Sequence, residues 1–100
     1  MDLPIACNLT DVEFQERRAG VLETVKRAVL EVKDLEDGYA YRFPSDESWI
    51  PELTKLITAE RACCPFLRFN LRIEPSRGPI WLELTGPEGT KDFLQSLFSA

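Results

Sequence analysis

The sequence predicts a single α+β domain, in which helices cover one face of an antiparallel sheet of roughly four strands. The chain has 100 residues, the size of one domain. Its apolar pattern changes period along the chain in the order helix, strand, strand, helix, strand, strand, helix. We therefore expect an N-terminal helix followed by two ββα units within one domain over residues 1–100, with residues 1–9 irregular. Strands with one apolar face need helices to cover that face.

The first helix is predicted over residues 10–28. Thr10 and Glu13 have the spacing of a capping box, which marks a helix start. The charged side chains of this segment, among them Arg17 and Arg18, are interpreted as a solvated face. The apolar side chains recur at helical spacing and form a stripe of Phe14, Val21, Leu22, Val25 and Val29.

The strands are predicted from alternation of apolar and polar residues. A hairpin is expected over residues 28–44, with its turn at Asp37 and Gly38. Two further strands are expected over residues 67–74 and 79–85. The apolar residues expected to face the helices are Leu30, Val32, Tyr39, Tyr41, Phe43, Leu67, Phe69, Leu71, Ile73, Ile80, Leu82 and Leu84.

The opposite face of this sheet carries arginines and a tryptophan, namely Arg42, Arg68, Arg72 and Trp81. Trp and Arg are enriched in protein interfaces, so an exposed Trp among arginines indicates a partner surface, such as that of a homodimer. The alternative is a solvated sheet face without a partner.

The second helix is predicted over residues 45–64, ended by Pro65. Its apolar stripe contains Trp49, Leu53, Leu56 and Ile57. At about 100° per residue, Glu60 and Cys64 fall inside this stripe and Cys63 on its flank. A carboxylate in a core stripe must be protonated, paired or bound to a ligand.

Two interpretations of Glu60 remain open. In the first, its carboxylate forms an ion pair or a capping bond, with the candidate partners Arg61, Arg68 and Arg72. In the second, Glu60 forms a site with the thiol of Cys64, its i,i+4 neighbour.

The three cysteines allow a metal site. If the N-terminal segment folds back over the helix end, Cys7 joins Cys63 and Cys64 in a cluster supported by Glu60. Thiolates select soft metals such as zinc, copper or mercury. The alternatives are an interaction module or homodimer with structural cysteines and, third, a thiol-dependent enzyme. The last is disfavoured because the chain contains no histidine and a helix C-terminus raises a thiol pKa.

Composition excludes other classes of function. The net charge of −5 argues against nucleic acid as a partner, because phosphate binding needs a positive surface. No apolar segment approaches the roughly 20 residues needed to cross a bilayer. The N-terminus does not have the pattern of a signal peptide, so we expect a cytoplasmic protein without a membrane partner.

Four segments, PIACNLT, DGYAYRFP, ERACCPFLRF and GPIWLELTGPEGTKDFL, resemble a family of small uncharacterised bacterial proteins with an ER-CCPFL-F motif. The resemblance extends over nearly the whole chain, and ERACCPFLRF is its most specific part. It implies a bacterial cytosolic protein and no particular reaction. It also ranks soft metals above other ligands, and it implies a shared importance of Cys7, Glu60, Arg61, Cys63, Cys64, Pro65 and Phe66.

Overall fold

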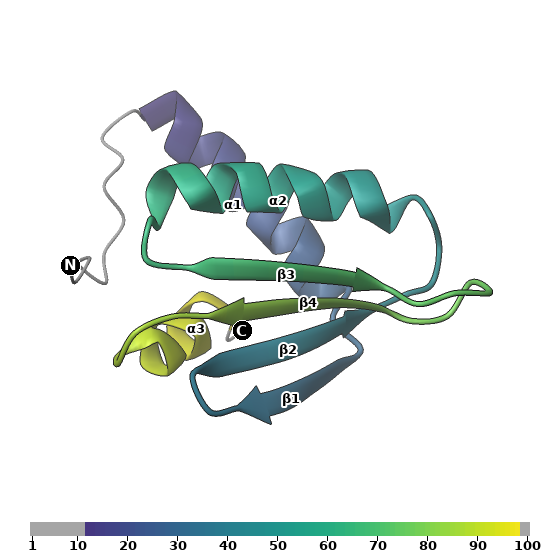
Figure 1. The fold of residues 1–100 in the computed structure, drawn as a ribbon. Helices are drawn as coiled ribbons and strands as arrows, with labels where there is room; N and C mark the ends of the chain where they lie inside the picture. Colours follow the sequence, from purple (N-terminus) through teal and green to yellow (C-terminus); the bar gives the residue numbers. More distant parts are fainter. Residues whose placement is uncertain (1–11, 99–100) are drawn as a thin grey trace.

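A computed structural model describes residues 12–98 and confirms the α+β class (Figure 1). Three helices and a four-stranded antiparallel sheet follow one another in the predicted order. The capping residue Thr10 and the irregular segment 1–9 lie outside the described residues. The elements are α1 (Val12–Arg27), β1 (Glu31–Leu35), β2 (Gly38–Phe43), α2 (Trp49–Cys63), β3 (Arg68–Ile73), β4 (Ile80–Thr85) and α3 (Thr90–Phe98).

The strand order in the sheet is β1-β2-β4-β3, and all neighbours are antiparallel. Each predicted strand pair forms a local hairpin, and the two hairpins join through β2 and β4 in the centre. The register places Tyr41 opposite Val32 on one side and Leu82 on the other, and Leu82 opposite Leu71. These four residues define the inner face of the sheet, the one that the helices cover.

The core lies between this inner face and the helices. Phe43, Leu82 and Leu84 of the central strands are fully buried and belong to one apolar cluster with Val25 of α1 and Leu94 of α3. The helix α2 adds Leu53 and Leu56 to the same cluster. Figure 1 shows α2 running along the sheet with α1 crossing behind it, and α3 beside the ends of β2 and β4.

Coverage of the inner face is incomplete at the two edge strands. Val32 of β1 is 53% exposed and Ile73 of β3 is 50% exposed, although both point to the inner side as predicted. The prediction that they join the core is wrong, because both residues lie on edge strands, where the apolar face is only partly covered. The last helix begins at Thr90, because residues 87–89 form a turn before it.

Candidate functional site

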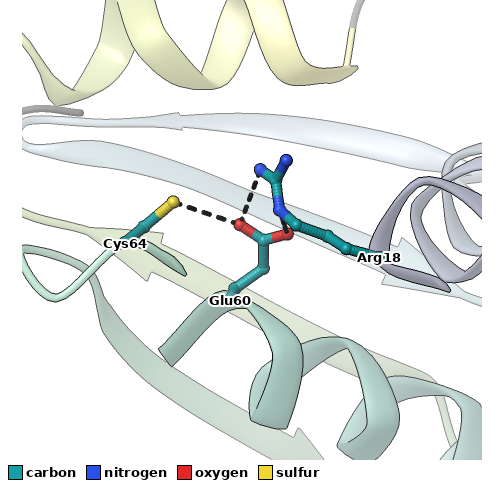
Figure 2. Close-up of polar contacts among 3 residues, drawn as sticks. All are labelled: Arg18, Glu60 and Cys64. Carbon is teal, nitrogen blue, oxygen red and sulfur yellow. Dashed lines mark hydrogen bonds and ion pairs between the residues drawn. The ribbon is translucent and has the colours of Figure 1, made fainter. Parts of the chain in front are cut away.

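Glu60 is the one charged residue among the fully buried residues of the described part of the chain, with 1% of its surface exposed. It lies in the last turns of α2, on the side that meets α1 (Figure 2). Arg18 of α1 donates two hydrogen bonds to it, from Nε to Oε1 at 2.7 Å and from Nη2 to Oε2 at 3.1 Å. A two-point contact of this kind fixes the relative orientation of the two charged groups.

Cys64 follows α2 as its C-terminal cap and is fully buried. Its thiol donates to Glu60 Oε2 at 3.3 Å, and its backbone N–H donates to the Glu60 carbonyl oxygen at 2.6 Å. Burial raises the pKa of the Cys64 thiol to about 12, with the Glu60 carboxylate as the next cause and Arg18 opposing both. At neutral pH the thiol therefore keeps its proton and satisfies the second carboxylate oxygen.

The guanidinium of Arg18 balances the negative charge of the Glu60 carboxylate. Burial lowers the pKa of Arg18, but the hydrogen bond and the charge of Glu60 outweigh this and raise it overall. Arg18 therefore remains a cation at any pH at which the protein is folded. A raised thiol pKa is the opposite of what a nucleophilic cysteine needs, so the arrangement does not favour a thiol-dependent enzyme.

Cys63 brings a third potential ligand. One ligand atom each of Glu60, Cys63 and Cys64 lie within 4.8 Å of one another, and all three residues are buried. Cys64 is a free thiol, whereas Cys63 is disulfide-bonded in this structure, so it must be reduced before it can bind a metal. Cys7, the predicted third thiolate, lies outside the described residues.

The partner of Glu60 differs from the predicted candidates. Arg61 is exposed, and Arg68 and Arg72 lie on the opposite face of the sheet. The interpretation of Arg18 as part of a solvated face is wrong, since its side chain is only 16% exposed. The sequence did contain an indication that Arg18 is buried. Arg18 stands three, four and seven residues before the apolar residues Val21, Leu22 and Val25, which is the spacing of their own stripe.

A groove between α1 and α2 runs beside this ion pair. Its volume is about 400 Å³. Val21 and Ala59 form part of its apolar surface, and Arg18 faces it together with Arg17 and Lys55. Arg18 lines this groove, whereas Glu60, Cys63 and Cys64 are buried.

The residues of the predicted partner surface share the face of the sheet that the helices leave open, but the tryptophan among them is covered. Arg42 and Arg72 both stand opposite Trp81 in the register, and Arg68 lies at the far end of β3. Contrary to the expectation, Trp81 is only 6% exposed. Lys33 lies over its ring at 4.7 Å and Arg72 at 5.9 Å, and both side chains shield the indole from solvent.

Two arginines of this face also form ion pairs. Arg42 donates to Glu31 at 3.0 Å, and Arg72 contacts Glu74 at 2.8 Å and Glu83 at 3.4 Å. The face therefore presents a mixture of both charges rather than a purely basic surface.

Comparison of the chain with protein-family models, with curated proteins and with solved structures finds no match. Among the helices of residues 12–98, none has the length and apolar character needed to cross a membrane. What the chain does is therefore inferred from the geometry of the site.

Proposed function

We propose that the reduced protein binds one soft metal ion, such as zinc, copper(I) or mercury(II), through the thiolates of Cys63 and Cys64 and the carboxylate of Glu60. The observation that carries the proposal is the spacing of at most 4.8 Å among the three ligand atoms. In a tetrahedral zinc site with Zn–S bonds of about 2.3 Å, two sulfurs stand about 3.8 Å apart. The ligands thus need only a small inward movement. Cys7 is proposed as the third thiolate.

Electrostatics supports a cation at this point. For a divalent ion held by Cys63, Cys64 and Glu60 alone, two thiolates and one carboxylate leave one negative charge, which the guanidinium of Arg18 balances at hydrogen-bond distance from Glu60. A Cys7 thiolate adds one further negative charge, which the release of one ligand or a proton on one thiol has to offset. A buried site with no net charge avoids most of the cost of taking ions out of water. The metal replaces the thiol proton that Cys64 now donates to Glu60, so binding releases protons and strengthens with pH.

The test is an anaerobic titration of the reduced protein with Zn(II), Cu(I) and Hg(II), followed by thiolate-to-metal charge-transfer absorption. Saturation at one ion per chain is expected. Cys63→Ser and Cys64→Ser should each abolish tight binding, and Cys7→Ser and Glu60→Gln should weaken it. Thr58→Ser, which removes one methyl group on an exposed part of α2 and keeps the hydroxyl, is the control and should leave the titration unchanged.

The oxidised protein offers a second control. With Cys63 disulfide-bonded, only one of the two neighbouring sulfurs can bind metal, so the charge-transfer band should be weaker until reductant is added. Absence of saturable binding by the reduced, folded protein contradicts the proposal. Binding that survives Cys64→Ser also contradicts it.

The second candidate function is that of an interaction module or homodimer whose cysteines are structural. It is favoured by the closed set of contacts at Glu60, in which Arg18 and the protonated Cys64 already satisfy both carboxylate oxygens. In that case Cys64→Ala lowers the stability of the protein and leaves its mass in solution and its lack of metal binding unchanged. Light scattering of the wild-type protein and the variant, together with the metal titration, distinguishes the two functions.

A further inference from the structure

The strand β1 forms an edge of the sheet whose outer side pairs with nothing in the described residues. All of its residues except Leu35 are exposed. The inner side of this edge is apolar, since Val32 and the preceding Leu30 are 53% and 55% exposed. A groove of about 420 Å³ continues from Val32 along Tyr39 to Leu94 and Phe98 of α3. Unpaired edges with an apolar border are templates for the addition of another strand.

The charges of β1 favour a second copy of the same strand. When two copies pair antiparallel about a two-fold axis at Val32, the two Val32 side chains face each other. Each Glu31 then stands opposite Lys33 of the other copy, which gives two cross-strand pairs of opposite charge. Leu30 stands opposite Asp34, whose carboxylate is already bound by Lys91 of α3.

The other edge of the sheet is less suited to such pairing in the corresponding register. The outward side chains of β3 are Arg68, Asn70 and Arg72, with no acidic residue among them. Pairing two copies of β3 about Asn70 places Arg68 opposite Arg72 twice, and like charges directly opposite one another destabilise a pair of strands.

We propose that the protein forms a two-fold homodimer through β1, in which two four-stranded sheets join into one continuous sheet. The axis stands perpendicular to the sheet, so both layers of helices lie on the same side and the two apolar grooves meet above Val32. The contact removes the unpaired edge and covers Val32, two effects that a dimer through the open face does not have. A contact along five residues predicts a dimer that dissociates on dilution.

A charge exchange tests the register. The substitution Glu31→Lys sets two lysine side chains opposite each other at both paired positions, and Lys33→Glu sets two glutamate side chains there. Each variant should therefore have the mass of one chain by light scattering or sedimentation. A one-to-one mixture of the two variants restores both pairs of opposite charge, so it should have the mass of two chains, as the wild-type protein does. Recovery in the mixture also shows that each variant is folded.

Arg68→Glu is the matched control, an inversion of charge on an exposed strand residue at the other edge of the sheet. It should leave the two-chain mass unchanged. A wild-type protein with the mass of one chain at every concentration overturns the proposal. So does a dimer that resists both β1 variants, a mixture that stays monomeric, or a dimer that only Arg68→Glu dissociates.

Discussion

Replacing Arg18 by Met removes the charged partner of Glu60 and keeps the apolar part of the side chain. Glu60, 1% exposed, is left with the Cys64 thiol as its only side-chain donor among the described residues. Removal of one member of a buried ion pair costs about 3–5 kcal/mol, because an uncompensated charge stays in the core. Arg18 is 16% exposed, so water reaches part of the site and the lower end applies. We expect the free energy of unfolding to fall by about 3 kcal/mol.

Urea unfolding at neutral pH, followed by circular dichroism, measures this change. For a slope of about 1–3 kcal/mol per molar urea, the midpoint should fall by about 1–3 M. Arg17→Met is the matched control, because Arg17 is the neighbouring residue but is 77% exposed, and its contact with Glu13 is 3.6 Å long. Its effect should stay within about 0.5 kcal/mol.

The double variant Arg18→Met with Glu60→Gln distinguishes two contributions to stability: the loss of the ion pair and the cost of an unpaired buried carboxylate. A neutral amide removes the uncompensated charge, so the double variant should be more stable than Arg18→Met alone. The reasoning is refuted if Arg18→Met is no less stable than Arg17→Met, or if the added Glu60→Gln lowers stability further.

Two other measurements concern the thiol and the glycines. The pKa of Cys64 rises from 9.0 to about 12 on folding, so the unfolded chain loses this proton first and stability falls between pH 9 and 12. Over that pH range the Cys64→Ala variant should lose less stability than the wild-type protein. An equal loss would contradict the raised pKa of Cys64. A Cβ at Gly38 would lie 1.8 Å from the Leu84 carbonyl oxygen, so Gly38→Ala should cost about 3 kcal/mol in urea unfolding. Gly20→Ala meets no atom within 4 Å and should stabilise α1 by about 0.5–1 kcal/mol; a similar effect at both positions would be the contrary result.

The fold class and the element order could be predicted because local periodicity determines both. Alternation assigned the inner face of β2 and β4 correctly, and helical spacing placed Glu60 in a buried stripe. Which strands lie at the edge depends on pairing between distant segments, so the exposure of Val32 and Ile73 was not predictable from alternation. The burial of Trp81 was not predictable for the same reason, because Lys33 and Arg72, which cover its ring, come from two other strands.

The proximity of Glu60, Cys63 and Cys64 was predictable from the sequence, and the contact of Glu60 with Arg18 was not. The cysteine pair and Glu60 lie within about one helical turn, so their proximity follows from local geometry. Arg18 reaches Glu60 from a different helix, and only the packing of α1 on α2 decides that contact. Its position in the apolar stripe of α1 marked it as buried, but many surface arginines stand near apolar residues because their stems cover apolar surface.

The central position of β2 and β4 also determines how the chain reaches its folded state. Each hairpin joins strands that are close in sequence, whereas pairing β2 with β4 closes the loop that contains α2 and β3. Closing a long loop costs entropy before the contacts that compensate for it are made. The transition state for folding should therefore contain the contact of Tyr41 with Leu82, so that changes there slow folding. Changes in β1 and β3, which join the sheet from outside, should mainly accelerate unfolding.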